Sequence, residues 1–127
     1  LPAREAVFVA ELDLDRAQAW TDLGERVRAT PLPRHPSSVR DLSIVIQDSL
    51  PAVAVRDTIR RAAPATLERM REFDRYQGKG VPDGRCSLSV RLTFRAVDRT
   101  LTDAEVQSAM DVIVAALAKE HGATLRH

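Results

Sequence analysis

The stretch from Phe73 to Thr102 decides the fold, and it reads FDRYQGKGVPDGRCSLSVRLTFRAVDRTLT. Its second half alternates between apolar and polar residues. The apolar positions are Cys86, Leu88, Val90, Leu92 and Phe94, and the polar positions are Ser87, Ser89, Arg91, Thr93 and Arg95. Successive side chains of a strand point to opposite faces. The alternation therefore predicts a long strand with one core face and one cationic, hydroxyl-bearing face.

The residues before this strand predict a loop and a partner strand. Glycines at 78, 80 and 84, with Pro82, form a loop too long for a tight hairpin turn. We expect the partner strand to run from Leu67 to Tyr76. Its alternation is imperfect, because Phe73 fits the core face while Met70 fits neither face well. A β-bulge between Met70 and Phe73 would reconcile the two.

The segment before Arg34 is predicted to be an arm and linker, residues 1–33. Val7 to Asp15 alternates like a strand, and Asp15 is placed to cap a short helix that ends near Leu23 and buries Ala19, Trp20 and Leu23. The proline-rich run at 30–38 then indicates a stiff connector. Because the chain begins at Leu1 rather than Met and its first strand has no obvious partner, we expect it to be a piece of a longer polypeptide.

The remaining elements complete one domain, residues 34–127. We predict strands at 39–46 and 124–126 and helices at 53–63 and 102–120, the first stopped by Pro64. Thr102 and Glu105 match a capping box, and Gly122 supplies a left-handed cap. The order strand, helix, strand, strand, helix, strand is the split βαβ arrangement. The expected fold is therefore α+β and ferredoxin-like, a four-stranded antiparallel sheet with both helices on one face and the other face open.

Composition excludes several classes of protein. The chain has 127 residues, 44% of them apolar, which is enough for one core. The single Cys86 excludes a disulfide framework within the chain and a cysteine-rich metal site, and it fits a reducing cytoplasm. The histidines at 35, 121 and 127 lack ligand-like spacing, so we expect no metal site. No apolar run approaches membrane-spanning length.

Charge is unevenly distributed along the chain. The net charge is only +1, yet residues 56–99 hold eleven lysines and arginines against six acidic residues. This surplus lies on the segment quoted above, where a polyanion would find it. A solvated sheet face would show the same surplus.

The open face carries the candidate site. Parity assigns to it Ser43, Asp74, Tyr76, Ser87, Ser89, Arg91, Thr93 and Arg95. Single-stranded RNA is bound by stacking splayed bases on aromatic side chains and by hydrogen bonds to their edges. Tyr76 is suited to stack a base, and Asp74 to accept from a guanine or cytosine amino group. Alternatively, Tyr76 merely closes the end of a strand.

Several of these motifs resemble one known family. They are Arg40-Asp41-Leu42, the run from Phe73 to Gly80, Ser87-Leu88, and the run from Leu92 to Asp103. Together they resemble the ferredoxin-fold anticodon-binding domain at the C-terminus of the bacterial phenylalanyl-tRNA synthetase β subunit. The run from Glu11 to Asp15 is similar to the end of the inactive, catalytic-like module that precedes this domain.

The resemblance implies a function and partners. It implies a non-catalytic, cytoplasmic module that binds the anticodon stem-loop of phenylalanine tRNA within an α2β2 ligase. The catalytic chemistry, with ATP and Mg²⁺, would belong to the α subunit, and this fragment would need no cofactor. By position, Asp74 and Tyr76 match the residues that contact the first anticodon base, a guanine, with Ser87 beside them. Ser43 matches the position against the middle base.

Face parity adds Arg91 and Arg95 as candidate phosphate contacts. One position departs from the family pattern, since Arg75 stands where an apolar residue is usual.

Other function classes remain as alternatives. One is another ferredoxin-like module that binds RNA or protein without catalysis. Another is an acylphosphatase-like enzyme, but that chemistry needs an arginine-bearing phosphate loop after the first strand. Here the loop at 47–51 is acidic and has no arginine.

Overall fold

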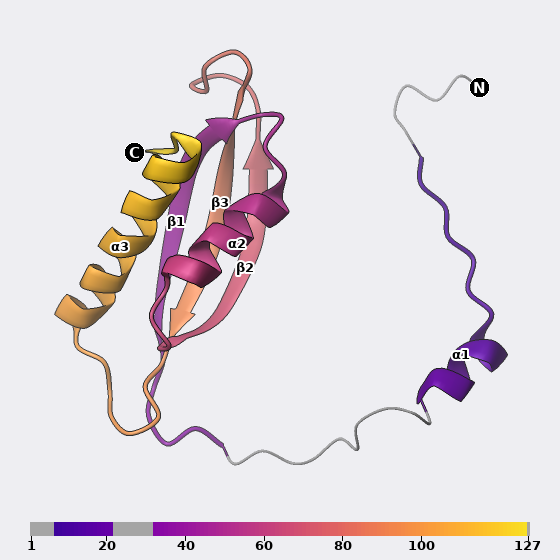
Figure 1. Cartoon of the computed structure of the whole chain (residues 1–127), viewed down its shortest axis with the longest axis horizontal. Coiled ribbons are helices and arrows are strands. Elements are labelled where there is room, and N and C mark those ends of the chain that lie inside the picture. Colours follow the sequence, from indigo (N-terminus) through magenta and orange to yellow (C-terminus); the bar gives the residue numbers. More distant parts are fainter. Residues whose placement is uncertain (1–6, 22–31, 127) are drawn as a thin grey trace. The chain divides into compact units, whose positions relative to one another are not determined.

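The computed structural model describes residues 7–21 and 32–126 (Figure 1). The chain divides into two units, Leu1–Leu32 and Pro33–His127. The first unit contains helix α1 (Leu14–Thr21). The second contains β1 (Ser38–Gln47), α2 (Ala52–Ala62), β2 (Leu67–Tyr76), β3 (Arg85–Phe94), α3 (Asp103–His121) and β4 (Thr124–Leu125).

The second unit has the predicted split βαβ topology. Its four strands form one antiparallel sheet in the order β2-β3-β1-β4, so β3 and β1 are central. Figure 1 shows α2 and α3 on the same side of this sheet. Within the described residues of this unit, the opposite face therefore carries no helix, and the prediction of an α+β ferredoxin-like fold is confirmed.

The core lies between the helices and the alternate residues of β1 and β3. Every predicted core residue of β3 is buried, from Cys86 to Phe94, and so are Leu42, Ile44 and Ile46 of β1. The helices contribute the apolar residues Val55, Ile59, Val106, Met110, Ile113 and Leu117. Strict alternation thus places the apolar side chains of β3, together with Leu42, Ile44 and Ile46 of β1, on one face.

Local signals set the ends of α3. The Thr102 hydroxyl accepts from the Glu105 backbone N–H at 3.3 Å, and the Glu105 carboxylate accepts from the Thr102 N–H at 2.9 Å. This is the predicted capping box. At the other end, Gly122 adopts the left-handed conformation, with φ 59°, and its N–H donates to the Ala118 carbonyl. The chain can therefore reverse directly into β4.

The first unit differs from its prediction. Residues 7–13 form no strand, and helix α1 is capped by Asp13 rather than by Asp15. The Asp13 carboxylate accepts from the backbone N–H groups of Asp15 and Arg16, at 3.1 and 3.2 Å. Apolar alternation alone does not form a strand without a partner to pair its backbone groups.

Part of the predicted arm lies outside the described residues. This holds for Leu23, for the side chains of Ala19 and Trp20, and for the first two residues of the proline-rich connector. Residues 32–37 of the connector form neither helix nor strand. Among residues 7–21 and 32–126, no helix has the length and apolarity that crossing a membrane requires.

The second correction concerns Phe73, which is not a core residue. Its side chain is 49% exposed. The pairing of β2 with β3 shifts between Glu72 and Asp74, which leaves Phe73 as the extra residue of a bulge, and it shifts again between Leu67 and Arg69. The predicted bulge between Met70 and Phe73 was therefore misplaced. The bulge offsets the alternation on its two sides, so Phe73 lies on the same face as both Arg71 and Tyr76, away from the helices.

The capping box makes a prediction about pH. Hydrogen bonds from the Thr102 backbone, and then from Arg99, lower the pKa of Glu105 from 4.5 to about 2. Because the folded pKa is depressed, the ionised carboxylate stabilises the fold above pH 4.5, and this contribution is lost as the pH falls from 4.5 towards 2. We expect Glu105→Gln, which keeps a cap but loses the titration, to flatten the fall of the thermal midpoint over that range.

Circular dichroism melts at a series of pH values measure this difference. Asp83→Asn is the matched control, because Asp83 makes no ion pair or side-chain hydrogen bond with the described residues. If the thermal midpoint changed with pH in the same way in the wild type and in Glu105→Gln, this would contradict the assignment of the pH dependence to Glu105.

Candidate nucleic-acid interface

The strand register places the predicted site residues on the open face. Tyr76 of β2 pairs with Ser87 of β3, which pairs with Val45 of β1. In the next row, Asp74 pairs with Ser89, which pairs with Ser43. These two adjacent rows contain four of the predicted residues: Ser43, Asp74, Tyr76 and Ser87. All four lie on the face opposite to α2 and α3.

Tyr76 lies at the β2 edge of this face, and its ring contacts an arginine that follows β4, the strand at the opposite edge of the sheet. The guanidinium carbon of Arg126 lies 5.1 Å from the centroid of the Tyr76 ring, a cation–π distance. Arg126 is itself fixed next to β1, because its backbone N–H donates to the Ser43 carbonyl at 2.9 Å. The ring remains 37% exposed. Sequence reasoning missed Arg126, which is 50 residues away from Tyr76 in the chain.

A glycine allows the tyrosine hydroxyl its position. A Cβ at Gly78 would lie 2.7 Å from the Tyr76 hydroxyl oxygen, and the backbone of Gly78 has a φ of +151°. A larger residue here would meet both strain and a clash. The loop after β2 therefore leaves space for the Tyr76 side chain as well as joining two strands.

Two serine side chains in these rows are less accessible to solvent than the sequence predicts. Ser87 is 1% exposed and Ser89 is 6% exposed. The Ser43 and Ser89 hydroxyl oxygens are 2.9 Å apart and share a hydrogen bond. The Ser87 hydroxyl is buried and has no hydrogen-bond partner among the described residues. A ligand reaches it only if neighbouring side chains move aside, and bonding to a ligand would then satisfy a buried polar atom.

Asp74 is the available acceptor on this face. Its carboxylate is exposed and makes no hydrogen bond or ion pair with the described residues. It lies two positions from Tyr76 on the same strand, with the serine rows alongside. A planar group stacked on Tyr76 would therefore find an anionic acceptor near its edge.

The two predicted arginines are already engaged. Arg91 donates from Nε and Nη2 to the two carboxylate oxygens of Asp41, both at 2.7 Å, and these bonds lower the pKa of Asp41. Arg95 donates from Nε to Glu68 at 3.1 Å and from Nη1 to the His35 carbonyl at 2.7 Å. A bidentate pair occupies one edge of a guanidinium. Both arginines are therefore less available to bind a phosphate group than an arginine without an ion-pair partner would be.

The structure identifies two further cations that sequence reasoning missed. Arg69 pairs in register with Thr93, and Arg71 pairs with Arg91, so both lie on the open face. Both are exposed, and neither forms an ion pair or side-chain hydrogen bond within the described part of the chain. Their parity is hidden in the sequence because bulges interrupt β2 on both sides of them.

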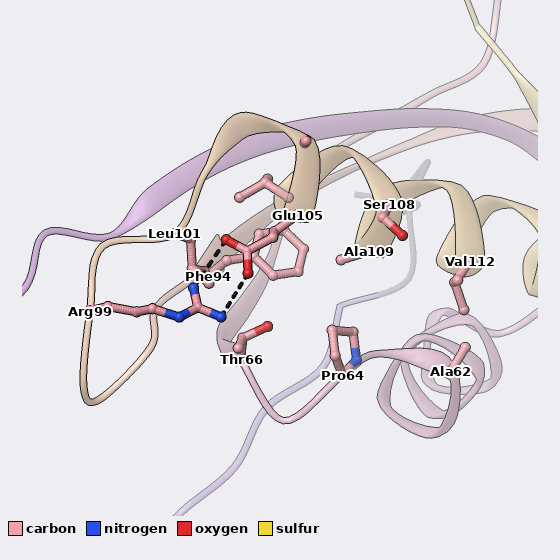
Figure 2. Close-up of a pocket in the computed structure, with 12 residues that line it drawn as sticks. Ala62, Pro64, Thr66, Phe94, Arg99, Leu101, Glu105, Ser108, Ala109 and Val112 are labelled. Carbon is pink, nitrogen blue, oxygen red and sulfur yellow. Dashed lines mark hydrogen bonds and ion pairs between the residues drawn. The ribbon is translucent and has the colours of Figure 1, made fainter.

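A hollow of about 540 Å³ lies away from this face, between the end of α2 and the start of α3 (Figure 2). Most of its lining is apolar. Arg99 and Glu105 form an ion pair at its rim, 2.7 Å between Nη2 and Oε1. That pair belongs to the helix cap, and within residues 7–21 and 32–126 no group of His, Cys, Asp and Glu is arranged to hold a metal ion.

A helix-free sheet face with an exposed tyrosine, a free carboxylate and cations is typical of ferredoxin-like domains that bind single-stranded nucleic acid. Residues 33–126 match the family model of the ferredoxin-fold anticodon binding domain, and the chain belongs to this family.

Proteins that are similar in sequence to this chain have names consistent with this family. The chain is 46% identical over 127 residues to a phenylalanine–tRNA ligase beta subunit of Moorella thermoacetica, with 99% of the chain and 15% of that subunit covered. It is 40% identical over 122 residues to one of Synechococcus sp. (strain JA-3-3Ab), covering 96% of the chain and 15% of the subunit. The chain thus spans about 15% of the length of these relatives.

The contact between Arg126 and Tyr76 makes a testable prediction. Tyr76 is the only tyrosine of the sequence, so its ring signals are unambiguous. We expect Arg126→Gln to shift the Tyr76 ring proton resonances in the NMR spectrum, since the cation leaves the ring face. Arg95→Gln, which removes a charge from the same face without touching this ring, serves as the control. Unchanged ring shifts in Arg126→Gln would contradict the contact.

Proposed function

We propose that the open face binds the anticodon loop of phenylalanine tRNA. The observation that carries this proposal is the pairing of an exposed Tyr76 ring with an unengaged Asp74 carboxylate on one strand edge. Membership of an anticodon-binding family and the names of the relatives support the choice of RNA.

In this proposal Tyr76 stacks the first anticodon base and Asp74 reads its edge. Guanine presents N–H donors on its Watson–Crick edge, which a carboxylate accepts, whereas adenine and uracil lack the same donor pair. Ser87 becomes a third contact once the side chains around it yield, and Ser43 lies against the middle base. Arg91 and Arg95 have a secondary role, since both are already bound to carboxylates.

We further propose that the chain is a non-catalytic part of a cytoplasmic phenylalanine–tRNA ligase of α2β2 composition, with residues 1–33 leading in from a preceding module. The relatives are beta subunits, which supports an α-subunit partner. In this proposal ATP and Mg²⁺ are bound elsewhere in the parent enzyme. Other ferredoxin-like modules that bind RNA or protein remain the competing class, and selective binding of the phenylalanine anticodon loop over other RNA loops distinguishes the proposed function from theirs.

The first test measures stacking. We expect Tyr76→Ala to weaken binding of a phenylalanine anticodon stem-loop to the 127-residue chain by about 1–3 kcal/mol, the range for one base stacked on an aromatic ring. Tyr76→Phe keeps the ring and should retain most of the affinity. Fluorescence anisotropy of an end-labelled stem-loop measures both. Equal affinity of the wild type and a folded Tyr76→Ala protein would remove this role.

The second test measures discrimination by Asp74. Stem-loops with guanine, inosine or adenine at the first anticodon position differ in the donors of that edge, and inosine lacks only the amino group. We expect wild type to prefer guanine over both by about 1–3 kcal/mol, the range for one wrong base contact, and Asp74→Asn to lose most of this preference. Losses of the same size for all three loops would show that Asp74 does not read the base.

A further inference from the structure

The bulge in β2 creates a second exposed aromatic surface on the open face. Phe73 is the extra residue of that bulge and is 49% exposed. The guanidinium carbon of Arg91 lies 5.4 Å from the centroid of its ring. Because Arg91 belongs to the open face, this contact shows that Phe73 lies over the same face as Tyr76. Phe73 lies two residues after Arg71 and keeps the face of that residue, and the bulge brings Asp74 and Tyr76 onto the same face.

Arg91 is held in place beside this ring. Both carboxylate oxygens of Asp41 bind it at 2.7 Å, so its guanidinium plane has little freedom. The exposed surface of the Phe73 ring and the adjoining guanidinium together offer a preorganised stacking platform, which loses little conformational entropy on binding. The ion pair that withdraws Arg91 from phosphate binding thus supports the aromatic ring.

The neighbouring part of β2 is cationic and uncompensated. Asp41 and Glu68 neutralise Arg91 and Arg95, whereas Arg69 and Arg71 have no such partners among the described residues. Both point to the open face, next to Phe73 along the strand. Exposed arginines beside an aromatic ring suit a nucleotide, whose base stacks while its phosphate meets the cations.

The spacing between the two rings indicates how RNA would lie on them. Phe73 lies opposite the step from Val90 to Ser89, and Tyr76 lies opposite Ser87, so the two residues are two to three positions of β3 apart, roughly 7–10 Å at about 3.3 Å per residue. Bases stacked on each other within one strand rise only about 3.4 Å per step. The two rings would therefore hold bases that are splayed apart, as in the single-stranded loops that proteins read.

We propose that Phe73, Arg69 and Arg71 form a second nucleotide subsite. In it, Phe73 stacks a further unpaired base of the RNA bound at Tyr76, and Arg69 and Arg71 bind the phosphates beside that base. This inference rests on the proposed function. It predicts that the bound RNA runs along most of the length of β2.

The stacking test uses the 127-residue chain and anticodon stem-loops with 2-aminopurine at each unpaired position except the first anticodon base. Stacking quenches the fluorescence of this base analogue. We expect one loop position to be quenched on binding to wild type and to stay bright with Phe73→Leu, which keeps the apolar volume but loses the ring. Affinity should fall about 5- to 150-fold, as for one stacked base.

Phe8→Leu is the matched control, because Phe8 is 92% exposed in the other unit. It should leave both quenching and affinity unchanged. Thermal midpoints establish that each variant is folded. A Phe73→Leu protein that loses affinity without any change in quenching would show that the ring only shapes β2, and this would overturn the subsite.

The phosphate contacts are tested by the salt dependence of affinity. Each of Arg69→Ala and Arg71→Ala should lower the slope of log K against log salt by about 0.7, the value for one contact to a single strand. Lys119→Ala removes the same charge from the helix layer and should leave the slope unchanged. Equal effects of all three would indicate general charge attraction and overturn the assignment.

The two proposals fail in different ways. Intact binding by Phe73→Leu, together with loss in Tyr76→Ala, would overturn the second subsite alone. Intact binding by both variants would overturn the proposed function as well.

Discussion

The structure depends on one constraint, that both helices of the second unit pack on the same face of its four-stranded sheet. The central strand β3 meets this constraint with an unbroken apolar series from Cys86 to Phe94, all buried against the helices. The polar residues between them are then forced onto the uncovered face. Because β1 pairs with β3 over the full length of both, Asp41 and Ser43 of β1 lie on the same uncovered face. The open face is thus a consequence of how the core is built.

The uncovered face is not uniformly exposed. Its centre is closed by Ser87, Ser89 and Val45, all nearly inaccessible, whereas its β2 side carries the exposed Phe73 and Tyr76. Charge on this face is divided in the same way, because Arg91 of β3 and Arg95 just after it are neutralised, whereas Arg69 and Arg71 of β2 have no ion-pair partner among the described residues. The side chains that we propose to contact RNA are therefore concentrated along the edge strand β2.

The sequence was sufficient to predict most of the fold, since the period-two pattern of β1 and β3, the capping box of α3 and the glycine after it are local signals with local consequences. It also predicted that Ser43, Asp74, Tyr76 and Ser87 share a face. It did not place Phe73, Arg69 or Arg71, because a bulge changes parity without leaving a signature in residue type. The partners of Arg91 and Arg126 were missed for another reason. Asp41 and Tyr76 are 50 residues away from them, and only the strand pairing brings them together.

The left-handed turn at Gly122 links the helix layer to the chemistry of the opposite face. The turn directs the chain from the end of α3 into β4, which pairs with β1. It thereby positions Arg126, whose guanidinium contacts the Tyr76 ring. A Cβ at Gly122 would meet no atom within 4 Å, so an alanine there costs only the backbone preference, on the order of 1–2 kcal/mol. In evolutionary terms, a substitution there can leave the core intact and still alter the electrostatic surroundings of an aromatic ring on the far side of the sheet.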